Sequence, residues 1–114
     1  MTRIYKILPE ADWRAAQALG RFEGSPVDLA DGFIHFSTAA QAPETARRYF
    51  FGQAGLVLVE FDADELGPSL RWEPARGGDL FAHLYGPLDC DLARSVRPIA
   101  LAADGAPLLG PLAP

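Results

Sequence analysis

The chain has little cysteine and little histidine, which limits the chemistry it can carry. A single cysteine, Cys90, cannot form an internal disulfide. Cys90 and the two histidines, His35 and His83, show no H-x-x-x-H, H-x-H or C-x-x-C spacing, so we expect no metal site. Asp89 and Asp91 flank Cys90 and should raise the pKa of its thiol, because negative charge disfavours a thiolate. The cysteine is therefore expected to be a poor nucleophile.

Other features that would identify a class of function are also absent. There is no glycine-rich phosphate-binding motif and no G-x-S-x-G segment of the kind that carries the serine of α/β-hydrolases. No apolar run approaches the roughly 20 residues needed to span a bilayer. The segment that begins at Met1 is too short and too polar for a signal peptide. We therefore expect a cytoplasmic protein with no membrane partner.

Positive charge is scarce and scattered. The formal net charge is −5, and of the 10 cationic side chains only Arg47 and Arg48 are adjacent. Nucleic-acid-binding proteins usually gather such side chains on one face. We therefore do not expect nucleic acid as a partner.

The length and composition predict a single domain. The chain has 114 residues, 49% of them hydrophobic, which is enough for an ordinary core without cross-links. We expect this domain to span residues 1–101. The tail at 102–114 is rich in proline and glycine and is either disordered or extended on the domain or on a partner subunit, so a homo-oligomer is one alternative.

The residue patterns predict an α+β fold, with helices early in the chain and strands dominating later. Helices are expected from Pro9 to Gly20 and from about 38 to 51, where Thr38 and Gln41 have capping-box spacing and Ala46, Tyr49 and Phe50 should face inward. The near-continuous apolar run at 56–61 predicts a central strand covered on both faces. Strands are further expected at 2–8, 33–37, 70–73, 80–85 and 96–101, a loop or single short turn at 24–32, and one helical turn at 88–93.

Two segments place polar side chains on strands. Alternation over residues 33–37 puts Phe33, His35 and Ser37 on one face, where an imidazole and a hydroxyl could bind a hydroxyl-rich ligand. The alternative is a buried, hydrogen-bonded histidine and a Ser37 or Thr38 that only caps the next helix. Both interpretations can hold together.

The second segment is Phe81-Ala-His-Leu-Tyr-Gly-Pro87, in which Phe81, His83 and Tyr85 would share a face. The alternative is an aromatic cluster with His83 bonded to the backbone. Nearby, Glu73 ends a strand beside a Gly-rich loop, a common place for an acid, a base or a hydroxyl clamp. A surface ion pair of Glu73 with Arg71 or Arg76 is the alternative there.

The strings Gly32-Phe-Ile-His-Phe-Ser-Thr38 and His83-Leu-Tyr-Gly86, together with Ile4-Tyr-Lys-Ile7 and Leu56-Val-Leu-Val-Glu60, resemble the bacterial domain-of-unknown-function family nine-five-two. That family is grouped by fold with ADP-ribosyltransferase-like domains. The resemblance implies a small, split, mostly antiparallel sheet with two main helices and a cleft that takes NAD as substrate in active relatives.

The resemblance also implies roles for individual residues. His35 and Ser37 match an H-x-S string whose histidine and hydroxyl bind the ribose and the carboxamide in those relatives. Tyr49 and Tyr85 are two candidates for a tyrosine that stacks on nicotinamide, and Glu73 for a glutamate that holds a ribose hydroxyl. We place His35, Glu73 and His83 as catalytic candidates.

Three functions follow as hypotheses. The first is an ADP-ribosyltransferase-like enzyme acting on a nucleotide or ribosyl ligand, with Ser37, Thr38, Tyr49, Arg71 and Tyr85 binding that ligand. The second is a non-catalytic small-molecule binding module that uses the same cleft. The third is an interaction protein that docks through its tail. The first two require His35, Glu73 and His83 to meet around one pocket.

Overall fold

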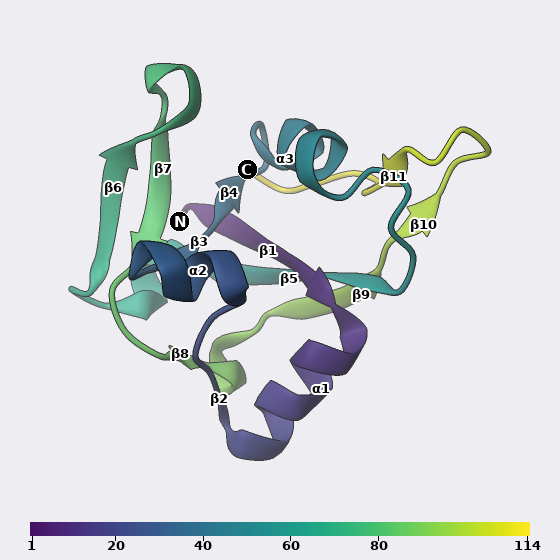
Figure 1. Ribbon diagram of the computed structural model, residues 1–114. Helices are drawn as coiled ribbons and strands as arrows, with labels where there is room; N and C mark the ends of the chain where they lie inside the picture. Colours follow the sequence, from purple (N-terminus) through teal and green to yellow (C-terminus); the bar gives the residue numbers. More distant parts are fainter.

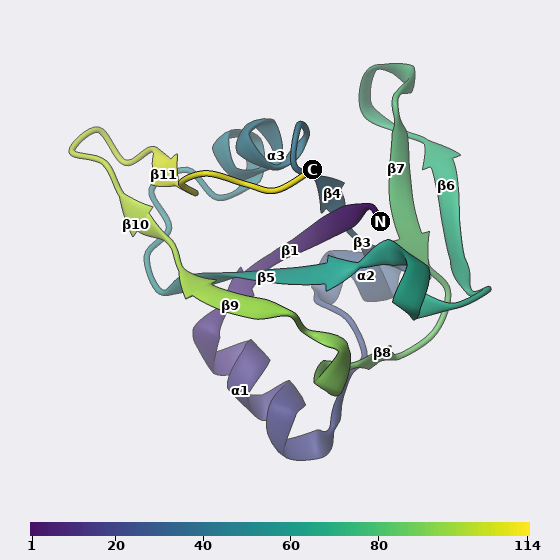
Figure 2. The ribbon, with the colours of Figure 1, turned by 180° about the vertical axis from the view of Figure 1, so that it is seen from behind.

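The main sheet is built around one apolar strand. The computed structural model describes residues 1–114, and its four-stranded sheet has the order β4-β1-β5-β9 (Figures 1 and 2). The central strand β5 (Leu56–Asp62) pairs with β1 (Arg3–Pro9) on one side and with β9 (Ser95–Pro98) on the other. The prediction of a central strand at 56–61 is therefore confirmed.

The remaining strands form a second sheet and two short ribbons. The second sheet has the order β3-β7-β6, with β3 (Ile34–His35), β7 (Leu80–Leu84) and β6 (Leu70–Pro74). Every strand pair in the molecule is antiparallel, which confirms an α+β fold with an antiparallel arrangement. The ribbons are β2 (Arg21–Phe22) with β8 (Leu88–Asp89) and β10 (Ala100–Leu101) with β11 (Pro107–Leu108).

Phe36 divides the strand that was predicted at 33–37. Residues before it belong to β3 in the second sheet, and residues after it form β4 (Ser37–Thr38) in the main sheet. The Phe36 side chain is 2% exposed and packs edge-on against Phe61 with ring centroids 5.8 Å apart. Its backbone N–H donates to the carbonyl of Ala82. The prediction of one continuous strand is wrong, because this buried residue carries the chain from one sheet to the other.

The first helix follows its sequence pattern closely. Helix α1 (Glu10–Leu19) buries Trp13 and Ala16 and ends at Gly20, whose φ of 89° is left-handed and suits glycine. Pro9 lies just before the helix rather than as its first residue. Figure 1 shows α1 against one face of the main sheet.

A helix forms where a loop or single turn was predicted. Helix α2 (Pro26–Asp31) begins after Ser25, whose backbone N–H donates to Asp28 Oδ2 at 2.8 Å in a capping box. Pro26 is the first helical residue, where its missing N–H costs no hydrogen bond. The density of turn-forming residues hid this S-x-x-D pattern, and the prediction of a loop at 24–32 is wrong.

The third helix is shorter than predicted. Thr38 and Gln41 exchange the two hydrogen bonds of a capping box, but in a turn that precedes helix α3 (Ala42–Tyr49). Ala46 is 1% exposed, whereas Tyr49 is 65% exposed, so the prediction that Tyr49 faces inward is wrong. The stripe at i, i+4 spacing, Ala42, Ala46 and Phe50, packs toward the sheet. The molecule thus has three α-helices rather than two main ones.

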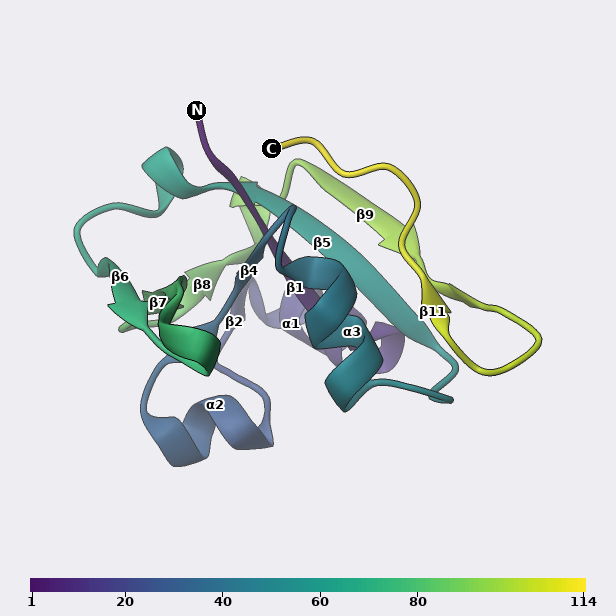
Figure 3. The same cartoon turned by 90° about the horizontal axis from the view of Figure 1, so that it is seen from above.

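Alternating residues of β1 and β5 separate two hydrophobic clusters. Ile4, Leu8 and Phe61 belong to the larger cluster, beneath α1, while Tyr5 and Leu58 belong to the smaller one, beneath α3 (Figure 3). Lys6 shares the face of Ile4 and Leu8, because side chains alternate along a strand. None of the helices is long and apolar enough to cross a membrane.

The C-terminal tail lies extended on its own domain. After β11, Leu109 and Leu112 pack against the smaller hydrophobic cluster. The hydroxyl of Tyr5 donates to the carbonyl of Ala113 at 2.6 Å, and Arg97 donates to the carbonyl of Pro111 at 3.2 Å. Figure 3 shows this segment running beside α3 and β9. The tail therefore covers part of the main sheet.

Candidate functional site

A cleft of about 700 Å³ runs over the junction of the two sheets. Its size falls within the range of roughly 300–1,000 Å³ that is typical of small-molecule sites. Residues of β1, α2, α3 and the β6–β7 hairpin line it. Four of the predicted site residues lie in the lining: His35, Ser37, Tyr49 and His83. Four others, Thr38, Arg71, Glu73 and Tyr85, do not line the cleft.

The two histidines meet because β3 and β7 are neighbours. His35 and His83 are paired across these antiparallel strands, with ring centroids 5.6 Å apart and an angle of 71° between the rings. Phe33 stacks on His83 at 4.1 Å and lies 4.6 Å from the ring of His35. Two distant segments of the sequence thus present imidazoles side by side.

Glu73 fixes the orientation of His83. Its Oε1 accepts hydrogen bonds from His83 Nδ1 at 2.8 Å and from the Tyr85 hydroxyl at 2.7 Å. The bonds from Tyr85 and His83 lower the pKa of Glu73, and the bond to Glu73 raises the pKa of Tyr85. Arg71 lies over the Tyr85 ring at 5.0 Å. An ionised Glu73 therefore selects the ring form in which Nδ1 carries hydrogen.

The other ring nitrogen of His83, Nε2, has no hydrogen-bond partner in the protein. The residue is 5% exposed. The one buried side-chain nitrogen or oxygen without a partner is Trp13 Nε1, so His83 Nε2 retains contact with solvent. His83 is also one of the residues that line the cleft. In the neutral ring, Nε2 is then a free hydrogen-bond acceptor.

A buried ion pair that the sequence did not indicate supports His35. Asp28 is 2% exposed, and its carboxylate lies 2.9 Å from Lys6 Nζ. Asp28 Oδ1 also accepts from His35 Nδ1 at 2.6 Å and from the His35 backbone N–H at 3.1 Å. Lys6 donates to the carbonyl of His35 at 2.9 Å. The pair thus holds both the ring and the backbone of His35.

Titration of this ion pair is strongly perturbed. Burial raises the pKa of Asp28, but the hydrogen bond from His35, the charge of Lys6 and the N–H of Ser25 outweigh it and lower the pKa to about 2. Burial lowers the pKa of Lys6, and Asp28 opposes that effect. His35 Nε2 faces a second carboxylate, Asp31, at 2.9 Å. Asp28 is therefore ionised over the whole neutral range.

Two hydroxyls and a guanidinium lie elsewhere in the cleft. The Ser37 and Thr45 hydroxyl oxygens are 2.9 Å apart, and Arg76 Nη2 donates to Thr45 Oγ1 at 3.3 Å. Ser37 is 5% exposed. Its hydroxyl bonds to Thr45 rather than to a histidine, so the geometry is not that of a serine nucleophile activated by an imidazole.

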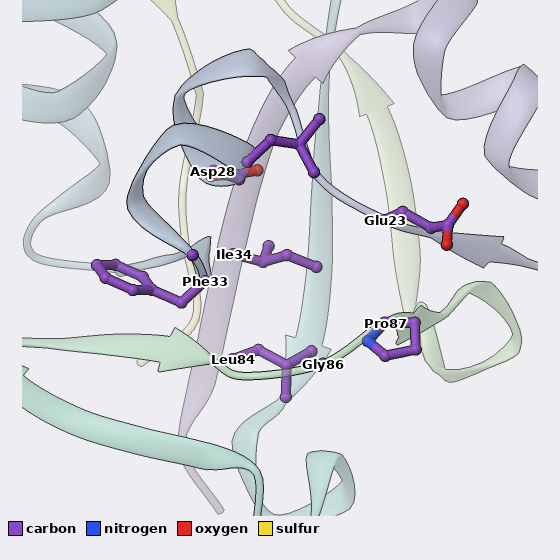
Figure 4. A pocket seen from close by; sticks show the side chains of 9 residues that line it. Glu23, Asp28, Phe33, Ile34, Leu84, Gly86 and Pro87 are labelled. Atoms are coloured by element: carbon purple, nitrogen blue, oxygen red, sulfur yellow. The ribbon is translucent and has the colours of Figure 1, made fainter.

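A second, smaller depression of about 240 Å³ lies on the other side of α2. Figure 4 shows Glu23, Ile34, Leu84 and Pro87 around it, with Asp28 at its wall. Neither histidine lines this depression. The candidate chemistry therefore belongs to the larger cleft.

Cys90 lies outside the site, because it lines neither the cleft nor the smaller depression. It is 8% exposed, and burial, with smaller contributions from Asp89 and Asp91, raises the pKa of its thiol. The predicted direction is confirmed, although burial rather than the two carboxylates is the largest cause.

Lys6, Asp28, Thr45 and Arg76 are the site residues that sequence reasoning missed. The capping-box spacing of Ser25 and Asp28 could have indicated a helix with an inward-facing carboxylate. A lysine among the apolar residues of a buried strand could have indicated an ionic partner. No local pattern pairs these two residues, which are 22 positions apart in the sequence.

The fold and the cleft define a small α+β protein with two antiparallel sheets and a histidine-lined cleft where they meet. The chain belongs to a protein family of unknown function, DUF952, whose model matches residues 7–96. This confirms the family predicted from the sequence strings. A comparison with curated proteins finds no match.

Solved structures of one bacterial protein are similar over nearly the whole chain. The crystal structure of protein CC0527 from Caulobacter crescentus is 56% identical, with 95% of each chain covered and a TM-score of 0.93. The solution NMR structure of the same protein is 56% identical, covers 96% of this chain and 95% of that one, and has a TM-score of 0.86. These similarities support the fold described above.

Proposed function

We propose that the cleft binds a small molecule, and that its ligand is a nucleotide or another ribosyl compound. The observation that carries this proposal is the free Nε2 of His83, a residue that Glu73 holds in place and that lines a cleft of about 700 Å³. A buried imidazole that exposes only one nitrogen to a cavity is typical of a ligand or proton-transfer site.

Side chains that line the cleft support a ribosyl ligand. His35 and Ser37 occupy the H-x-S string of the resemblance to ADP-ribosyltransferase-like domains, and both line the cleft. Sugar hydroxyls both donate and accept hydrogen bonds, which matches the free Nε2 of His83 and the hydroxyl of Ser37. Tyr49 also lines the cleft and supplies an exposed aromatic face for a base. We also propose, as part of the same hypothesis, that the fold is related to that of ADP-ribosyltransferase-like domains.

In a catalytic form of the proposal, His83 is the proton acceptor. When the glycosidic bond of NAD breaks, nicotinamide leaves and an attacking hydroxyl or water gives up its proton, which His83 Nε2 would accept. Glu73 then stabilises the charged ring through Nδ1, much as a carboxylate does in a catalytic triad. Glu73 therefore acts as a positioning residue and not as the ribose clamp that the resemblance implies.

The alternative is a binding module with the same cleft and no turnover. His35 favours this alternative, because Asp28 and Asp31 engage both of its ring nitrogens at 2.6 and 2.9 Å. The His35 ring is thus fixed in place, and it offers a ligand the surface of its ring rather than a free nitrogen. Binding and catalysis thus differ in what His83 does.

The test is a calorimetric titration of the full chain with NAD and ADP-ribose, followed by an assay for nicotinamide release. Saturable binding with release supports the transferase form, and binding without release supports the module. His83→Gln should abolish release, whereas Trp72→Phe, on an exposed position of the same hairpin outside the cleft lining, should change neither measurement. No saturable heat at millimolar NAD or ADP-ribose would refute the proposal.

A further inference from the structure

We infer that Arg76, Thr45 and Ser37 form an anion-binding subsite in the cleft, and that its occupant is a phosphoryl group of the ligand. This inference deepens the proposed function and rests on it, since it concerns the same cleft. It concerns side chains of the cleft other than the two histidines.

The charges in the cleft single out Arg76. Apart from the histidines, two cationic side chains line it, Lys6 and Arg76. Asp28 neutralises Lys6 at 2.9 Å, and Lys6 is buried with a further bond to the backbone of His35. Arg76 forms no ion pair with any carboxylate, and its one hydrogen bond goes to a neutral hydroxyl. Its positive charge is therefore available to a ligand.

The position of the guanidinium is defined by two contacts. It lies over the ring of Phe81 at 5.1 Å, and its Nη2 donates to Thr45 Oγ1 at 3.3 Å. A guanidinium has five N–H donors in a fixed plane, so four remain when one is used. Arg76 is thus oriented in advance, which reduces the entropy lost on binding an anion.

The two hydroxyls extend the set of donors. Thr45 Oγ1 accepts from Arg76 and lies 2.9 Å from Ser37 Oγ. Rotation of these hydroxyls can turn either O–H toward an anion beside the guanidinium. Three donor groups from separate elements suit the three terminal oxygens of a phosphoryl group better than the two oxygens of a carboxylate. Because the whole chain carries a net charge of −5, such binding depends on this local site.

The experiment is an NMR titration of the uniformly nitrogen-15-labelled full chain with inorganic phosphate, adenosine monophosphate and adenosine. Phosphate and the monophosphate should both shift the Arg76 Nε–H signal and the amides of Ser37 and Thr45. The monophosphate should bind about tenfold or more tightly than adenosine, since a hydrogen bond to a charged group is worth roughly that factor or more. Comparing free phosphate with the monophosphate separates the two sources of the same group.

Variants make the test specific to Arg76. Arg76→Gln should reduce affinity for the monophosphate about tenfold without changing affinity for adenosine, and Arg76→Lys should restore part of the loss. Arg14→Gln removes the same charge from an exposed position of α1 and should have no effect. An unchanged amide spectrum outside the cleft shows that each variant is folded.

The failures of the inference and of the proposed function are distinguishable. If the monophosphate and adenosine bind equally, or if Arg76→Gln binds the monophosphate as wild type does, the inference is overturned while nucleoside binding stands. If inorganic phosphate shifts Arg76 but no nucleotide, NAD or ADP-ribose binds, the subsite is supported and the ribosyl proposal fails. If phosphate shifts only residues outside the cleft, the inference is likewise overturned.

Discussion

Replacing Asp28 by asparagine should destabilise the protein strongly at neutral pH. Each hydrogen bond that the carboxylate makes in the structure comes from a nitrogen, on Lys6, Ser25 or His35. An amide at this position sets an NH₂ against those donors and leaves the Lys6 ammonium buried without its counter-charge. Removing one partner of a buried ion pair costs about 3–5 kcal/mol, so we expect a loss of that size in the free energy of unfolding.

The pH dependence supplies an independent magnitude. The folded-state pKa of Asp28 is about 2, against an ordinary value of 3.8. At about 1.4 kcal/mol per pKa unit, this difference corresponds to about 2 kcal/mol. Because the folded pKa is the lower one, this stability is fully present above the ordinary value. It is lost as the pH falls from about 5 to about 2.

Urea unfolding followed by circular dichroism at a series of pH values measures both quantities. Wild type should lose about 2 kcal/mol from Asp28 across the acid window, and Asp28→Asn should lack that part of the slope. Asp79→Asn, at an exposed residue with no side-chain partner, is the matched control and should follow wild type. If Asp28→Asn lies within about 1 kcal/mol of wild type at pH 7, well below the cost expected for a broken buried pair, the Lys6–Asp28 pair does not stabilise the fold as described.

Three further outcomes are expected. Tyr85→Phe removes the hydrogen bond that contributes most to lowering the pKa of Glu73. The pKa of Glu73 should therefore rise toward its ordinary value, as measured in a carbon-13 NMR titration. A Glu73 pKa unchanged from wild type would count against the Tyr85–Glu73 bond. Phe36→Ala leaves a cavity at the crossing between the sheets and should cost about 3–5 kcal/mol in urea unfolding; a loss below about 1 kcal/mol would contradict the role given to Phe36. Deleting residues 102–114 uncovers the smaller hydrophobic cluster, including Tyr5, and should cost about 2 kcal/mol, measured by the same method. An unchanged stability would mean that the tail does not pack in solution.

Local patterns predicted the parts of the fold that local physics determines. The apolar run of β5 predicted a central strand, because a buried strand requires apolar side chains. Gly20 predicted the end of α1, because a left-handed φ favours glycine. Helix α2 was missed because turn-forming residues outweighed the single capping pair of Ser25 and Asp28. The break at Phe36 was missed because alternation is the same whether one strand continues or two strands meet.

In the candidate site, too, local patterns predicted some features, whereas others depend on the tertiary fold. Strand alternation placed His35 and His83 on strands, but their pairing depends on which strands become neighbours, which is a tertiary outcome. The sequence could nominate Glu73 as a polar group near the hairpin, but its position against His83 and outside the cleft lining depends on the tertiary fold. The Lys6–Asp28 pair joins a strand to a helix, so no periodic pattern contains it.

The bonding of the C-terminal segment to β1 has a practical consequence for labelling and immobilisation. Ala113, next to the last residue, is tied to the hydroxyl of Tyr5 on β1, whereas Met1 is 69% exposed. A purification tag or fluorophore attached after Pro114 would pull against a segment that seals a hydrophobic surface. The same label placed before Met1 would extend freely into water, so fusions for the binding experiments belong at the amino terminus.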